Sequence, residues 1–191
     1  MSERTIVWRR LDLPGTEVLR LGVTPVEVRA ASTVVSVVRG APFELHYEVT
    51  CDGDWRLRRT QLALTQGREE RKLHLRADGA GEWMRGDGQP LPELAGCIDL
   101  DIAWSPFTNT LPIRRLQLAV GERADLSVAF VAVPALEVSL ARQTYTHVAD
   151  SGNDSYYLYE SASGFHAVLR VDREGVVLDY PGFFTCFESR G

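Results

Sequence analysis

Lysine and positive charge in general are scarce in this sequence. Lys72 is the only lysine, and 26 Asp and Glu residues outnumber 21 Lys and Arg residues, which gives a formal net charge of −5. Long-range attraction to the phosphate backbone of a nucleic acid, or to an anionic bilayer, is therefore not expected. The near-exclusive use of arginine reflects either a compositional bias or a need for planar guanidinium groups that face hydroxyl-rich partners.

Cysteines and long apolar runs are also few. The three cysteines, Cys51, Cys97 and Cys186, are too far apart in sequence for a zinc or redox motif, and free thiols are typical of a reducing compartment. No apolar run approaches the roughly 20 residues of a membrane-spanning helix. The first ten residues lack the basic stretch and apolar run of a secretory signal peptide. We therefore expect a soluble, cytoplasmic protein.

The common catalytic and cofactor motifs are missing. Gly79-Ala-Gly81 lacks the third glycine of a dinucleotide-binding loop, because Met84 stands in its place. There is no Gly-x-Ser-x-Gly turn for a nucleophilic serine. The histidines are scattered, and no pair has zinc-ligand spacing; they are His46, His74, His147 and His166. We predict no cofactor and no metal site, and we nominate no catalytic residue.

Apolar and polar residues alternate through most of the chain. Alternation with a period of two indicates half-buried strands. Asp52-Gly53 and Asp78-Gly79 fall between such runs, where residues that tolerate positive φ favour tight turns. The clearest runs cover residues 43–50, 55–58, 72–76, 116–120, 126–132, 165–171 and 176–180.

Helical periodicity is weak everywhere. The best helical candidate, residues 134–142, is short and is equally compatible with a strand. Turn signals recur about every ten residues, and no linker divides the chain. We predict one all-β domain over residues 1–191, built as a single antiparallel sheet that is curled or closed, with little helix.

Two carboxylates are predicted to share one face of a strand. If residues 98–102 are extended, Asp99 and Asp101 point to the same side, roughly 7 Å apart. That spacing suits paired acid–base chemistry of the glycosidase type. It also suits binding of sugar hydroxyls or a divalent ion, or pairing with Arg114 and Arg115, since like charges on one face need partners.

The segment 105–115 is the most unusual in the chain. Its two prolines bias Ser105 and Leu111 toward extended backbone, and Thr108-Asn109-Thr110 lies between them. In a strand the two arginines that follow would point to opposite faces. We interpret the segment either as a rigid connection between strands or as a polar rim at the mouth of a pocket.

Aromatic residues are concentrated late in the chain. Large apolar groups on both phases of a strand indicate burial on both sides, an interface or a cavity lining. Tyrosine and tryptophan rings also stack well on the faces of sugars. Core packing and ligand contact both remain open for these residues, which are Tyr145, Tyr156, Tyr157, Tyr159, Tyr180, Phe183, Phe184 and Phe187.

The chain resembles a known family along nearly its full length. The segments that carry the resemblance are 51–58, 78–83, 96–101, 105–116, 143–145, 171–175 and 179–183, of which Pro-Phe-Thr-Asn-Thr-Leu-Pro-Ile-Arg-Arg is the most specific. The family is that of the bacterial putative glycolipid-binding proteins, formerly a domain of unknown function. The resemblance implies a spiral β-roll, an incompletely closed barrel with an inner cavity similar to bacterial lipoprotein-carrier folds, and a glycolipid as ligand.

The favoured hypothesis is non-enzymatic binding of a small amphiphile in that cavity, with no nucleic acid as partner. Two alternatives stay open: a carbohydrate- or nucleoside-directed hydrolase that uses Asp99 and Asp101, or a protein-interaction module. The sequence does not predict an oligomeric state. The candidate ligand-binding residues are Arg58, Asp99, Asp101, Asn109, Arg114 and Tyr145.

Overall fold

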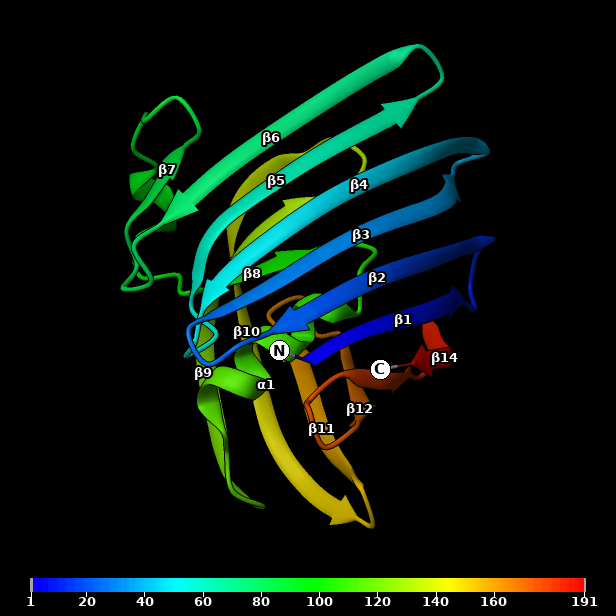
Figure 1. Ribbon diagram of the computed structural model, residues 1–191, viewed down its shortest axis with the longest axis vertical. Helices are drawn as coiled ribbons and strands as arrows, with labels where there is room; N and C mark the ends of the chain where they lie inside the picture. The colour runs from blue at the N-terminus through cyan, green and yellow to red at the C-terminus, as the bar shows by residue number, and fades with distance from the viewer. Residues whose placement is uncertain (1, 191) are drawn as a thin grey trace.

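A computed structural model describes the backbone of residues 2–190 and the side chains of residues 2–187. Fourteen strands of this described part form one sheet, in the spatial order β7-β6-β5-β4-β3-β2-β1-β14-β13-β12-β11-β10-β9-β8 (Figure 1). The strands are β1 (Ser2–Arg10), β2 (Gly15–Val23), β3 (Glu27–Val38), β4 (Ala41–Asp52), β5 (Leu57–Gln66), β6 (Glu69–Ala77), β7 (Trp83–Arg85), β8 (Asp99–Ile102), β9 (Arg123–Ala132), β10 (Glu137–Ser151), β11 (Asp154–Ser161), β12 (His166–Val171), β13 (Val177–Tyr180) and β14 (Phe184–Arg190). The all-β class and the single sheet are confirmed.

The chain crosses the sheet from its middle outward. The first and last strands, β1 and β14, pair with each other in the middle of the sheet. From β1 the chain proceeds strand by strand to the edge at β7, and from the opposite edge at β8 it returns strand by strand to β14. Every strand pair is antiparallel except β8 with β9. The prediction of a purely antiparallel sheet is wrong at this edge, because the connection between β8 and β9 contains a helix, and a long crossover permits parallel pairing.

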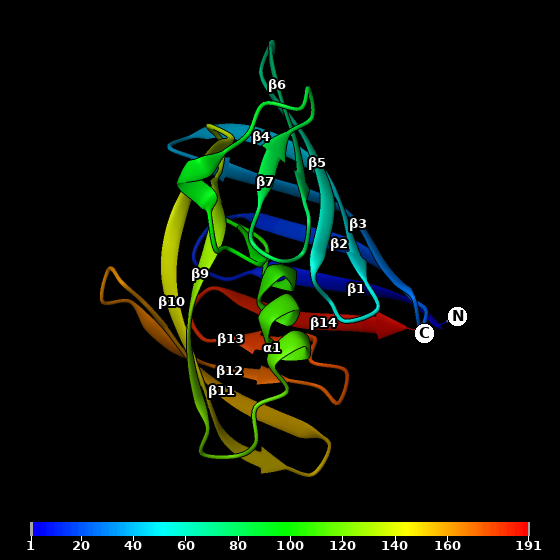
Figure 2. The ribbon, with the colours of Figure 1, turned by 90° about the vertical axis from the view of Figure 1, so that its left-hand side faces the viewer.

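The sheet is open and has two flanks, so the prediction of a closed or strongly curled sheet is wrong. Figure 2 shows β9 and β10 on one side of α1 (Thr110–Leu116) and β3 and β5 on the other. The edge strands β7 and β8 do not pair with each other in the described residues. We call β1–β7 the N-terminal flank and β9–β14 the C-terminal flank.

Alternation places one face of each flank inside. In β4, Leu45 and Tyr47 are buried, whereas Glu44 and Glu48 are exposed, as the sequence predicts. The inner face of the N-terminal flank packs against the segment between β7 and α1, which contributes Leu94, Leu100, Ile102, Phe107 and Leu111 to the same apolar cluster. The inner face of the C-terminal flank has a smaller cluster around Tyr145 and Leu169.

The helix lies where the sequence predicts extended chain. Residues 107–109 form a 3-10 turn, η2 (Phe107–Asn109), that leads directly into α1, so the extended conformation predicted for Leu111 is wrong. Pro112 is tolerated because it stands in the first turn of α1, where backbone N–H groups have no partner within the helix. A second 3-10 turn, η1 (Pro92–Leu94), precedes β8.

Two further expectations differ from the structure, each for its own reason. Gln117 has a φ of 47° and ends the helix in the left-handed region, so the strand predicted at 116–120 does not form. The helical alternative for 134–142 is also wrong, since Glu137 begins the strand β10.

We expect Gln117→Gly to stabilise the protein by about 0.5–1 kcal/mol, because glycine enters the left-handed region without the steric cost that Gln117 bears. Gln117 is exposed, so little packing is lost. Urea unfolding followed by circular dichroism measures the change.

The matched reverse substitution is Gly175→Ala. Gly175 has a φ of +75°, and an added Cβ would lie 2.9 Å from Arg114 Cδ. It should lower the free energy of unfolding by about 1 kcal/mol or more. A stability of Gln117→Gly equal to or below that of the native chain would contradict the role given to this helix end.

Candidate functional site

A cleft of about 300 Å³ lies between the C-terminal flank and the segment from β8 to η2, with Arg10 of β1 at its border, and is walled mainly by aromatic rings. Its polar lining consists of Arg10 at the end of β1, Asp101 in β8, Ser105 in the following turn and Asn109 in η2. We call it the aromatic cleft. Its principal rings are Trp104, Tyr159, Phe165, Tyr180, Phe183 and Phe184.

The rings of the C-terminal flank brace one another edge to face. Phe165 and Phe183 lie 5.3 Å apart between ring centroids, Tyr180 and Phe183 lie 5.6 Å apart, and Tyr159 and Tyr180 lie 6.3 Å apart. Such contacts fix the ring planes before any ligand arrives. Burial raises the pKa of Tyr159 and Tyr180, and the nearby Asp101 carboxyl raises both further, so their hydroxyls stay protonated.

Trp104 forms the opposite wall in a strained backbone conformation. Its φ of 81° is in the left-handed region, which large side chains rarely occupy. The ring packs edge-on against Phe43 at 5.1 Å, and the Arg10 guanidinium lies over it, 3.6 Å from the ring centroid. Arg10 also donates to Asp12 at 2.6 and 2.9 Å. Strain of this kind persists where the surroundings over-determine it, often at functional sites.

A buried glutamate holds the turn that carries Trp104. Glu17 Oε1 accepts hydrogen bonds from Tyr47 at 2.5 Å, from Ser32 at 2.8 Å and from Ser105 at 3.0 Å. Glu17 is 1% exposed, and its Oε2 has no hydrogen-bond partner among the described residues. Burial raises the pKa of Glu17 to about 7, against the three hydrogen bonds that lower it.

Sequence reasoning missed Glu17 and Arg10, although a signal was present. Glu17 is in phase with the buried Leu19 and Leu21, and Arg10 is in phase with the buried Trp8. A charged residue on the apolar phase of a strand needs a specific partner, and this marks it as a candidate. Trp104 gave no periodic signal, because it lies in a turn.

Asp101 borders the cleft and is bound by neutral groups. Thr108 Oγ1 donates to its Oδ1 at 3.2 Å, and Gln143 Nε2 donates to its Oδ2 at 2.6 Å. Burial raises the pKa of the Asp101 carboxyl, while these two hydrogen bonds oppose the shift. The carboxylate is therefore held in a fixed orientation beside the rings.

Asp99 has a different environment on the same face of β8. Arg115 Nε lies 3.0 Å and Nη2 lies 2.6 Å from the two carboxylate oxygens, a bidentate pair. The Asp99 side chain has 0% exposure. Burial raises the pKa of the Asp99 carboxyl, and the hydrogen bonds from Arg115 oppose that rise. Of the partners proposed for these carboxylates, Arg115 pairs with Asp99, and Arg114 pairs with neither.

Asn109 and Tyr145 form a linked pair at the cleft. The Tyr145 hydroxyl donates to Asn109 Oδ1 at 2.7 Å, and Asn109 Nδ2 donates to the Pro106 carbonyl at 3.2 Å. Asn109 borders the cleft, whereas Tyr145 is 1% exposed and lies behind it. The structure thus brings Asp101, Asn109 and Tyr145 together.

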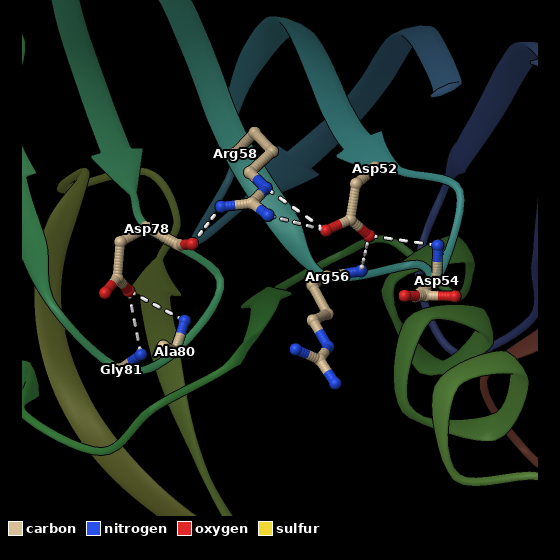
Figure 3. A network of polar contacts seen from close by, with 7 residues as sticks. All are labelled: Asp52, Asp54, Arg56, Arg58, Asp78, Ala80 and Gly81. Atoms are coloured by element: carbon tan, nitrogen blue, oxygen red, sulfur yellow. Dashed lines mark hydrogen bonds and ion pairs between the residues drawn. The ribbon is translucent and has the colours of Figure 1, made fainter. Parts of the chain in front are cut away.

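Arg58 and Arg114 lie away from the cleft. Figure 3 shows the Arg58 guanidinium between two turns, where it donates to the Asp52 carboxylate, at 2.8 Å from Nη2, and to the Asp78 carbonyl. Arg114 lies over the Trp55 ring, 5.3 Å from its centroid. Both arginines join loops in the described structure.

A larger hollow of about 870 Å³ lies over strands β1–β5. Its lining includes the exposed, outward-facing Arg20, Arg29, Glu48 and Arg59 and contains no aromatic residue. Solvated charges on an open sheet face bind small molecules weakly, whereas concave sites with apolar walls and few polar groups bind them well. The aromatic cleft is therefore the better candidate.

The described residues contain no group of three or more His, Cys, Asp or Glu side chains placed to hold a metal ion. Cys51 and Cys97 are buried free thiols. None of the helices within residues 2–190 has the length and apolar character needed to cross a membrane.

Comparison with known proteins shows a family relationship. A family model described as "Putative glycolipid-binding" matches residues 5–186. The chain is also similar to a DUF1089 family protein of known crystal structure from Pseudomonas aeruginosa, with 43% sequence identity over 90% of this chain and 91% of that chain, and a TM-score of 0.79. A search of curated proteins found no match.

We expect Asp99→Asn to lower the free energy of unfolding by about 3 kcal/mol, because it leaves the Arg115 charge partly buried without its partner. Asp125→Asn is the matched control, since its pair with Arg123 is exposed and should contribute much less to stability than the Asp99 pair. Urea unfolding measures the free energy of unfolding of both variants. Equal losses in the two would show that the Asp99 pair is no more important than a surface pair.

Glu17 should make stability depend on pH. Its pKa rises from 4.5 to about 7 on folding. The contribution of Glu17 to the free energy of unfolding is therefore fully present below about pH 4.5, and it is lost as the pH rises through 7. We expect Glu17→Gln to gain up to about 3 kcal/mol relative to the native chain over that range. Glu48→Gln, on the exposed face of β4, serves as the control. Parallel stability–pH curves for Glu17→Gln and the native chain would refute this role.

Proposed function

The chain belongs to the "Putative glycolipid-binding" family, and from this premise we propose that its aromatic cleft binds the sugar head group of an amphiphile without catalysing a reaction. One observation carries the proposal: six pre-positioned rings and a few fixed polar groups converge on one concave site. Aromatic walls with sparse, oriented polar groups are typical of small-molecule binding sites.

Each part of the cleft has a task in this proposal. The ring faces of Trp104 and Tyr180 pack on the C–H groups of a sugar ring. The Asp101 carboxylate accepts hydrogen bonds from sugar hydroxyls, and Asn109 stands beside it with its amide oriented by Tyr145. Tyr145 and Asp99 act indirectly, and Arg58 and Arg114 make no contact with the ligand.

The size of the cleft and the place of the acyl chain are part of the same proposal. A volume of about 300 Å³ is at the lower limit for ligand sites and suits a head group better than a whole lipid. We propose that the space between the two flanks continues from the cleft and takes the acyl chain. The match of residues 5–186 to the "Putative glycolipid-binding" family model supports this arrangement.

The two alternatives have less support. A hydrolase with paired carboxylates needs both of them to reach the substrate, but Arg115 engages both oxygens of Asp99 and only Asp101 borders the cleft. A protein-interaction surface formed by the late aromatic residues needs them exposed, but Tyr157, Tyr159 and Phe184 are buried. Binding is therefore the function that the geometry supports best.

We also propose a cytoplasmic location. The thiols of Cys51 and Cys97 are free, which is typical of reducing compartments. Fractionation of the source cells tests this, and recovery from an oxidising compartment would overturn it.

We expect Tyr180→Ala to weaken the binding of octyl β-glucoside, below its micellar concentration, by about tenfold, because a stacked ring is lost from the cleft. Isothermal titration calorimetry measures the affinity. Tyr156→Ala is the matched control. Tyr156 lies on the face of β11 opposite to the cleft-lining Tyr159 and does not line the cleft itself. No detectable binding to the native chain, or equal loss in the two variants, would count against the proposal.

A further inference from the structure

The Asp101 carboxylate lacks a cationic partner. Among the described residues Asp101 forms no ion pair within 4.0 Å, although Asp99, two residues earlier, has a bidentate arginine. Thr108 and Gln143, which donate to Asp101, are both neutral. Burying a carboxylate without a countercharge costs several kcal/mol, so the cleft favours a ligand that supplies a cation.

The arginine that borders the same cleft does not supply that charge. Arg10 donates from Nε and Nη2 to Asp12, and its guanidinium also lies over Trp104. Its charge is thus balanced by Asp12, and the Asp99 charge is balanced by Arg115. The tyrosines that face Asp101 are neutral phenols, since burial raises the pKa of Tyr145, Tyr159 and Tyr180.

The aromatic rings of the cleft also favour a ligand with a positive charge. The face of an aromatic ring carries partial negative charge and attracts ammonium groups, most strongly in a desolvated site. The cleft combines several ring faces with one fixed, unpaired carboxylate. A neutral sugar uses only the packing surface, whereas a sugar with an amino group uses the packing surface, the ring faces and the charge.

We infer that the head group taken by this cleft is an amino sugar, whose ammonium group pairs with Asp101 while its ring stacks on the aromatic walls; the inference rests on the proposed function. Thr108 and Gln143 each hold one oxygen of Asp101 and leave further acceptor positions for the ammonium group. Asp101 is the residue that determines specificity in this arrangement.

The test compares three octyl glycosides that differ at one position of the sugar: glucoside, 2-amino-2-deoxyglucoside and 2-acetamido-2-deoxyglucoside. Calorimetry is carried out on the full chain at a pH at which the amine is protonated. We expect the amino glycoside to bind about tenfold to a hundredfold more tightly than the other two, as for hydrogen bonds to charged groups.

Two variants assign the preference to Asp101. Asp101→Asn should remove the preference for the amine and retain binding of the neutral glucoside. Asp125→Asn makes the same change of charge at an exposed position outside the cleft, and should keep the preference.

The outcomes separate the two claims. Equal affinities for all three glycosides in the native chain would overturn the amino-sugar inference and leave the proposed function in place. Failure of all three to bind would overturn both. The native chain alone decides between these results, so the inference stays testable if Asp101→Asn does not fold.

Discussion

The position of the aromatic cleft depends on one buried carboxylate. Glu17 projects inward from β2 and accepts hydrogen bonds from Tyr47 and Ser105, which lie on β4, two strands away in the sheet, and on the turn after β8. Ser105 follows Trp104, whose backbone is held in the left-handed region. A single acceptor therefore connects the N-terminal flank to the wall of the cleft.

This arrangement has an energetic cost. Replacement of buried ionic groups by apolar residues of similar volume is often neutral or stabilising. Glu17 is almost fully buried, and one of its oxygens has no partner among the described residues. An apolar residue at position 17 would fill the space, but it would leave the hydroxyls of Tyr47 and Ser105 without this acceptor and the Trp104 turn without its anchor.

Much of the sheet could be predicted, because alternation is a local property. The runs at 43–50 and 126–132 lie wholly in strands, and the run at 165–171 lies in β12 except for Phe165. The helix α1 could not be predicted in the same way, because a proline before its middle was taken as a sign of extended chain, and because its stability comes from packing of Phe107 and Leu111 in the core.

The site was only partly predictable. Asp101, Asn109 and Tyr145 were identified from sequence, and the structure brings them together. The cleft itself depends on contacts between segments far apart in the chain, since Arg10 and Tyr180 are separated by nearly the whole sequence. Hydrophobic periodicity contains no information on such pairings. The local signs of this region are Glu17 and Arg10, two charged residues on the apolar phase of their strands.

The pairing of β1 with β14 has a consequence for synthesis on the ribosome. The N-terminal flank can form its hairpins as the chain emerges, but one edge of β1 stays without a partner until residues 184–190 have been made. An unpaired strand edge is prone to pairing with another chain. Arg10 pairs with Phe184 in this ladder and both residues line the cleft, so the pairing that covers the free edge of β1 also completes the cleft.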